Sequence, residues 1–129
     1  NSPAILEQDD NFVVTGKAIS VEKTLYDFRQ LKRIDKDWAP ADGYDQSYVV
    51  DENCAVDPNT GLTLVAEAFS ERSKLKLEVY TNEPLVHFYT GKWIPALKGK
   101  NGNNIPHFPD TILRPGDTYQ TKTIYRVIN

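Results

Sequence analysis

The residues of this chain that are best suited to chemistry are acidic or aromatic, and they stand at the ends of predicted strands. Asp45 follows a glycine-containing loop, and His87, Tyr89 and Trp93 lie close together further along the chain. Carboxylates accept hydrogen bonds from neighbouring hydroxyl groups, while aromatic rings cover the C–H face of a sugar ring. Taken singly, each of these residues is more often a turn former or a core residue. As a group they are candidates for a carbohydrate site.

Other kinds of site lack their residues. The sequence contains no glycine-rich phosphate loop, no serine nucleophile elbow, no CxxC pair and no HExxH motif. Only two histidines, His87 and His107, are present, and zinc sites need three or four well-spaced ligands, so no metal site is expected. Cys54 has acidic neighbours that disfavour its thiolate, which predicts an inert thiol.

Two strands joined by a sharp turn are predicted between Leu75 and Gly91. Leu75, Leu77 and Val79 alternate with charged or hydroxylated residues, so we expect them to face the core. The segment 82–84 contains a proline and interrupts this pattern, and a second strand follows over residues 85–89. The sequence leaves open whether the connection is a hairpin or a corner.

The rest of the chain also predicts β-structure. Residues 1–16 read as an extended lead-in, and the recurring Leu25, Phe28, Leu31 and Ile34 favour a compact loop or a helical turn. Further strands are predicted at 17–22, 44–50, 62–69 and 118–128, turns at 57–61, 70–73 and 113–117, a packed segment at 93–95, a flexible loop at 98–104 and renewed order at 105–109. The expected fold class is an all-β antiparallel sandwich, with 62–80 forming a meander after 44–50.

Composition places the chain among ordinary globular proteins. Its 129 residues carry a net charge of −3, and 40% of them are apolar, which predicts one domain. No basic block favours nucleic acid, and no apolar run reaches membrane-spanning length. A single cysteine and the absence of a glycosylation sequon favour the cytoplasm. Because the chain begins at Asn1, we expect it to be a piece of a longer protein.

Several short blocks occur in the same order as in one known family. They are Thr15-Gly16, residues 25–29 (LYDFR), 43–49 (GYDQSYV), 77–84 (LEVYTNEP), 88–91 (FYTG) and 112–119 (ILRPGDTY). In this order they resemble the C-terminal part of aldose 1-epimerases, the galactose mutarotase family. Their residues are most similar to those of fungal members, some of which are fused to a UDP-galactose 4-epimerase domain. The resemblance covers nearly the whole chain, so residues 1–129 are interpreted as the C-terminal part of such a domain.

The resemblance implies a fold, an activity and a site. The fold is a large antiparallel β-supersandwich, and the activity interconverts the α and β anomers of free hexoses such as glucose or galactose without a cofactor. A base removes the proton of the anomeric hydroxyl, an acid protonates the ring oxygen, and the opened sugar recloses from its other face. The family's aspartate that binds sugar hydroxyls is matched by Asp45. His87 stands where many members have a sugar-binding glutamine, and Tyr89 follows it.

The catalytic residues of the family have no counterpart in this sequence. Its histidines belong to an N-terminal half that is absent here, and the interval 92–107 contains no glutamate where the family carries its catalytic base. No catalytic residue is therefore assigned. Two interpretations remain: the chain is part of an enzyme whose N-terminal half completes the site, or it is a non-catalytic carbohydrate-binding β-sandwich.

Overall fold

The computed structural model describes residues 2–37, 43–91 and 113–128, and in these the chain forms strands and turns but no helix. The strands are β1 (Ala4–Gln8), β2 (Val14–Ser20), β3 (Asp45–Val49), β4 (Thr63–Phe69), β5 (Lys76–Thr81), β6 (Leu85–Tyr89) and β7 (Thr123–Ile128). The part described therefore has no helix long and apolar enough to cross a membrane. The predictions for 93–95, 98–104 and 105–109 lie outside the described residues.

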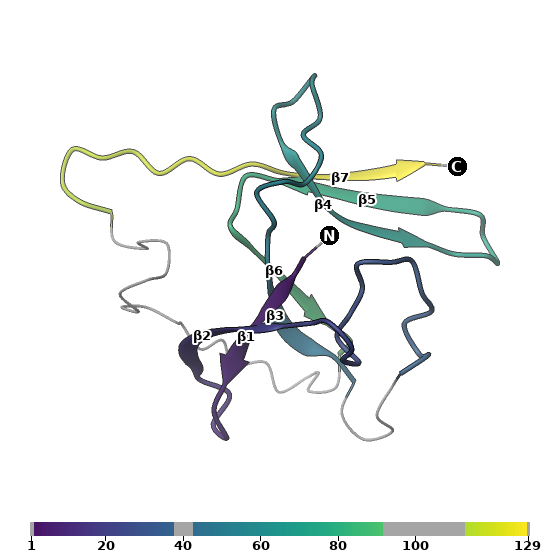
Figure 1. The fold of residues 1–129 in the computed structure, drawn as a ribbon. Coiled ribbons are helices and arrows are strands. Elements are labelled where there is room, and N and C mark those ends of the chain that lie inside the picture. The colour runs from purple at the N-terminus through teal and green to yellow at the C-terminus, as the bar shows by residue number, and fades with distance from the viewer. Residues whose placement is uncertain (1, 38–42, 92–112, 129) are drawn as a thin grey trace.

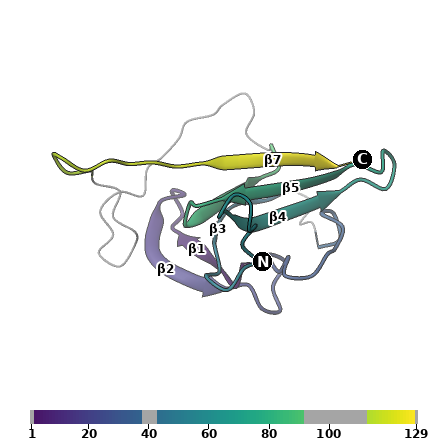
Figure 2. The same ribbon diagram turned by 90° about the horizontal axis from the view of Figure 1, so that it is seen from above.

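The strands form two antiparallel sheets, which confirms the predicted fold class. One sheet has the order β2-β1-β3-β6, and the other has the order β4-β5-β7. Figures 1 and 2 both show β4, β5 and β7 on one side of the molecule and β1 and β2 on the other. The predicted meander is confirmed for β4 and β5 only, because β3 pairs with β1 and β6.

The N-terminal lead-in is a strand, which the sequence reasoning missed. Strand β1 pairs with β2, and β2 begins at Val14 rather than at the predicted Lys17. Ile5 and Leu6 are both buried although they point to opposite faces, so β1 shows no alternation of apolar and polar residues. The connection is a tight turn in which the Asp9 carboxylate accepts hydrogen bonds from the backbone N–H groups of Asn11 and Val13, each at 2.9 Å.

The predicted turn at 82–84 is a corner between sheets and not a hairpin. Strand β5 pairs with β4 and β7, whereas β6 pairs with β3. The Pro84 carbonyl accepts a hydrogen bond from the backbone N–H of Val50 at 2.9 Å, and the Thr81 hydroxyl accepts one from the N–H of Glu83 at 3.1 Å. These bonds hold the corner, so β6 starts beside β3 and its side chains join the first sheet.

The burial of β5 is the reverse of the prediction. Glu78 and Tyr80 are 8% and 7% exposed, whereas Leu77 and Val79 are only half-buried. Tyr125 of β7, which pairs opposite Val79, is 70% exposed, so this apolar face is open among the described residues. Local alternation located the strand correctly but could not tell which face the rest of the chain covers.

Strand β7 is shorter than the predicted 118–128. Its ladder with β5 begins at Thr123, although the predicted turn at 113–117 is present, with the N–H of Asp117 bonded to the Arg114 carbonyl at 3.0 Å. Before the β5–β7 ladder begins, the Asn82 side chain makes the backbone hydrogen bonds that a neighbouring strand would otherwise make. Its oxygen accepts from the N–H of Lys122 at 2.9 Å, and its NH₂ group donates to the carbonyl of Gln120 at 3.3 Å.

Aromatic rings form the core of the β2-β1-β3-β6 sheet. Ile5, Val21 and Tyr48 make its buried centre, and the predicted compact loop after β2 adds Tyr26 and Phe28. Tyr44, which is 1% exposed, stacks on Phe88 of β6 with ring centroids 5.5 Å apart. This packing fixes β3 against β6, the two strands that carry the candidate site.

Candidate functional site

The alternation of β3 and β6 separates core residues from candidate site residues. Tyr48 and Phe88 point to the aromatic side, while Asp45, His87 and Tyr89 point to the other side of the sheet. We call this other side the His87 face. The predicted grouping of 87, 88 and 89 beside one site is therefore divided, because Phe88 belongs to the core.

Two hydrogen bonds clamp the His87 ring on this face. Its Nε2 lies 2.9 Å from Oδ1 of Asp45, and its Nδ1 lies 3.0 Å from Oγ of Ser47. Ser47 is directly opposite His87 in the ladder, and Asp45 is two residues before Ser47 on the same strand. The geometry follows from register alone, since residues i and i+2 share one face of a strand.

The clamped group is open to solvent. The His87 side chain is 49% exposed and that of Asp45 is 31% exposed. No hydrogen bond from a described residue reaches Oδ2 of Asp45, so this oxygen can accept from a ligand hydroxyl. An exposed pair of this kind contributes little to folding stability, which favours a binding role for it.

Tyr89 lies on the His87 face as predicted. It pairs opposite Asp45 in the ladder and is half-buried. The sheet therefore brings together all three residues predicted to bind substrate. Trp93 lies outside the described residues. Ser47 was not singled out from the sequence, and its signal would have been its position two residues after Asp45.

A second polar cluster lies on the other sheet, and its charged side chains are all paired. Arg126 of β7 bonds Asp57 at 2.8 Å and the Tyr80 hydroxyl at 3.1 Å, and it lies over the Tyr80 ring. Tyr80 donates to Glu78 at 2.7 Å, and Lys76 pairs with Glu78 at 2.9 Å. We call these five residues the Arg126 network.

Charge neighbours shift the titration of the Arg126 network. The hydrogen bonds of Lys76 and Tyr80 lower the pKa of Glu78, and the guanidinium of Arg126 lowers that of Asp57. The Glu78 carboxylate raises the pKa of Tyr80. Each member is satisfied by another member, so the network ties β7 and the 57–61 turn to β5 and serves the fold.

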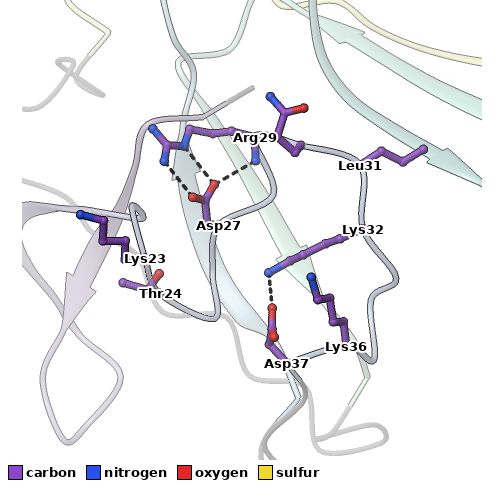
Figure 3. Close-up of a pocket in the computed structure, with 9 residues that line it drawn as sticks. Lys23, Thr24, Asp27, Arg29, Leu31, Lys32, Lys36 and Asp37 are labelled. Carbon is purple, nitrogen blue, oxygen red and sulfur yellow. Dashed lines mark hydrogen bonds and ion pairs between the residues drawn. The ribbon is translucent and has the colours of Figure 1, made fainter.

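A hollow in the loop between β2 and β3 carries several cations, and two of them, Arg29 and Lys32, are paired with carboxylates that also line it (Figure 3). Arg29 bonds Asp27 at 2.8 Å and lowers the pKa of that carboxyl to about 2. Lys32 bonds Asp37 at 2.7 Å and lies 4.4 Å from the centre of the Phe28 ring. The charges of Arg29 and Lys32 are thus neutralised locally, which makes the hollow a weak candidate for an anion site.

Metal and thiol chemistry find no support in the residues described. Within residues 2–37, 43–91 and 113–128, no three His, Cys, Asp or Glu side chains are grouped to hold a metal ion. Cys54 is buried. The group formed by Asp45, Ser47, His87 and Tyr89 is therefore the candidate site.

Comparisons with known proteins agree on one family. The sequence matches the family model described as aldose 1-epimerase over residues 1–126. Galactose mutarotase of Rattus norvegicus is 30% identical over 146 aligned residues, which cover 95% of this chain and 41% of that protein. Aldose 1-epimerase of Escherichia coli K12 is 28% identical over 136 residues, which cover 84% of this chain and 38% of that protein.

A solved structure gives the same result for the fold. The crystal structure of an aldose epimerase homologue from C. elegans matches with a TM-score of 0.77 at 29% identity. The match covers 98% of this chain and 43% of the other. The chain thus spans about two fifths of the length of the relatives it matches.

Proposed function

The chain belongs to the aldose 1-epimerase family, and on this premise we propose that it contributes the sugar-binding strands of an enzyme that interconverts the anomers of free hexoses. The family resemblance inferred from the sequence is confirmed by the match over residues 1–126. The observation that supports a sugar site here is the hydrogen-bonded pair Asp45–His87, at 2.9 Å and open to solvent.

The chemistry of the pair suits a hexose. The carboxylate of Asp45 can accept hydrogen bonds from ring hydroxyls through Oδ2, while the partly exposed His87 ring holds its other oxygen in place. Tyr89, on the same face, offers an aromatic ring and a phenol. Ring opening then requires one group that takes the proton of the anomeric hydroxyl and another that protonates the ring oxygen. No cofactor enters these steps.

The proposal extends to the rest of the enzyme. Relatives are more than twice as long as this chain, so we propose that residues 1–129 form the C-terminal part of the domain and that an N-terminal half of the same polypeptide completes the site. A glucose- or galactose-class monosaccharide is the proposed ligand, and the cytoplasm is the proposed compartment.

One observation favours a second candidate, a non-catalytic carbohydrate-binding domain. The interval 92–107 contains no glutamate that could act as the base of the reaction. In this alternative, Asp45 and His87 hold a sugar without opening its ring. The two candidates predict the same binding and differ in turnover.

Polarimetry with calorimetry tests both candidates. Freshly dissolved α-D-glucose or α-D-galactose should reach anomeric equilibrium faster with the complete polypeptide, in which the N-terminal half is present, than in buffer alone. Asp45→Ala should weaken sugar binding by roughly tenfold or more, because a charge-assisted hydrogen bond is removed. The matched control is Asp35→Ala, which removes an exposed carboxylate paired with Arg33 in the loop. Unaccelerated equilibration with intact binding would select the second candidate, and unchanged binding by Asp45→Ala would contradict the site.

A further inference from the structure

Ser47 lies directly opposite His87 in the β3–β6 ladder, whereas Asp45 lies diagonally across from it. The Cβ atoms of directly opposed residues are about 5 Å apart, and diagonal neighbours are about 7 to 8 Å apart. The His87 ring must therefore lean along the strand for its Nε2 to come within 2.9 Å of Oδ1 of Asp45. The 3.0 Å hydrogen bond between Nδ1 and Oγ of Ser47 keeps the ring in this orientation.

The surroundings of Ser47 direct its hydroxyl toward the ring. Within the part of the chain that the structure describes, Nδ1 of His87 is the one hydrogen-bond partner of this hydroxyl. The neighbouring strand β1 places Leu6 on the same face, and Leu6 is apolar and 4% exposed. A hydroxyl can either donate or accept, so it can bond Nδ1 whether or not that nitrogen carries a proton.

The exposure of His87 makes the bond to Ser47 important. Its side chain is 49% exposed, so packing alone does not hold the ring. With a single bond to Asp45, the ring and the carboxylate could change rotamer together. Ser47 is half-buried and its side chain is short, so it ties the ring closely to the backbone of β3. The second bond therefore restricts both the ring and the carboxylate.

The same clamp determines what the Asp45 carboxylate can offer a ligand. A carboxylate that rotates freely can bind two neighbouring hydroxyls, one with each oxygen. Here the His87 ring engages Oδ1, and no hydrogen bond from a described residue reaches Oδ2. The site thus presents one unoccupied acceptor in a fixed direction, which suits a single hydroxyl group.

On the basis of the proposed sugar site, we propose that Ser47 is a positioning residue that sets its specificity. Through His87, Ser47 fixes Asp45 so that Oδ2 accepts a hydrogen bond from one particular hydroxyl of the hexose. The gain comes from pre-organisation, because the carboxylate need not be ordered when the sugar binds. Ser47 takes no part in the proton transfers, so its loss should weaken binding and leave the chemical step unchanged.

Monodeoxyfluoro hexoses test the proposal in the complete polypeptide, because a C–F group cannot donate a hydrogen bond to Oδ2. Calorimetry with D-galactose, D-glucose and their derivatives measures each affinity. The wild type should bind one derivative about tenfold more weakly than its parent sugar. Ser47→Ala should weaken binding of the parent roughly threefold to tenfold and leave that derivative unchanged, so the discrimination shrinks. Ser47→Thr keeps the hydroxyl and should restore both values.

Steady-state kinetics separate positioning from catalysis. Ser47→Ala should raise KM by the same factor as it weakens binding, with kcat within about twofold of the wild type. The matched control is Ser20→Ala, a serine on the same face of the edge strand β2. The Ser20 hydroxyl accepts a hydrogen bond from the backbone N–H of Glu22 at 3.2 Å, so the control removes a bonded hydroxyl outside the site. It should leave binding and discrimination unchanged.

The outcomes separate this proposal from the proposed function. Wild-type affinities in Ser47→Ala, equal weakening of every sugar, or a lower kcat with unchanged KM would overturn the positioning role and leave the proposed function standing. If the wild type binds no hexose, the proposed function is contradicted. Carbon-13 relaxation of the His87 ring then decides the clamp, with its signal identified by its loss in His87→Gln. A more mobile ring in Ser47→Ala supports the clamp, and an equally rigid one overturns it.

Discussion

The two sheets carry similar polar side chains in opposite states. In the Arg126 network, carboxylates, a tyrosine and two cations satisfy one another, and Glu78 and Tyr80 are almost fully buried. On the His87 face, Asp45 and His87 are paired but remain one-third to one-half exposed. The difference is that the Asp45 carboxylate keeps hydrogen-bonding capacity at the surface, where a ligand could use it. Where all of it is used internally, the carboxylate holds the fold.

The largest expected effect comes from the core behind the His87 face. Tyr44→Ala removes a ring that is 1% exposed and stacks on Phe88, so it should lower the free energy of unfolding by about 3 kcal/mol or more. Urea denaturation measures this loss. Tyr44→Phe is the control: it keeps the ring and gives up a 3.2 Å hydrogen bond to the Leu25 carbonyl, at a cost of about 1 kcal/mol. Equal losses for both variants would mean that the ring contributes nothing.

The Arg126 network should respond next most strongly. Arg126→Ala leaves Asp57 and Glu78 without their shared cation, so the melting temperature should fall by several degrees. Lys17→Ala is the control, because Lys17 forms an exposed pair with Glu7 at 3.6 Å. Thermal unfolding followed by circular dichroism compares them. If Arg126→Ala is as stable as the wild type, the claim that the Arg126 network stabilises the fold is contradicted.

Acid should weaken the same network. The pKa values of Glu78 and Asp57 are lowered below their ordinary values of 4.5 and 3.8 in the folded state. Their contribution to stability is therefore complete above the unfolded-state values and is lost as pH falls through the folded ones. The melting temperature should be flat down to about pH 5 and fall below it, and Arg126→Gln should show a shallower fall. A variant curve parallel to that of the wild type would contradict this assignment.

The smallest effect on folding is expected at the candidate site. Asp45→Asn keeps the shape of an exposed side chain, so the melting temperature should stay within experimental error of the wild type while sugar binding weakens. Thermal unfolding and calorimetry on one preparation test the two halves of this prediction. A clear drop in melting temperature would place Asp45 with the structural carboxylates and erase the contrast between the sheets.

Local sequence pattern predicted the strands that are buried on one side. Strands β3 to β6 were located within a residue or two because their apolar and polar residues alternate or their turns contain proline and glycine. Strand β1 was missed, since Ile5 and Leu6 are buried on opposite faces and leave no period of two. The burial of β5 is the reverse of the prediction because Glu78 lies in a network with Arg126 and Asp57, and both of these residues are distant from Glu78 in the sequence.

The candidate site was predictable in its residues but not in its geometry. Asp45, His87 and Tyr89 were identified from type and family resemblance. Their alignment depends on the register of β3 and β6, which pairs Ser47 with His87, and local sequence does not determine a pairing between distant strands. Ser47 was missed for this reason: its significance comes entirely from the residue across the ladder.

The Asn82 amide has a consequence for the order in which the second sheet assembles. Strands β4 and β5 are joined by a short turn and can pair early, whereas β7 must arrive from far along the chain. Because Asn82 offers both an acceptor and a donor to residues 120–122 just before the ladder begins, it can capture the arriving segment in register. We therefore expect Asn82→Ala to slow the refolding phase that adds β7, a kinetic signature that stopped-flow fluorescence would detect.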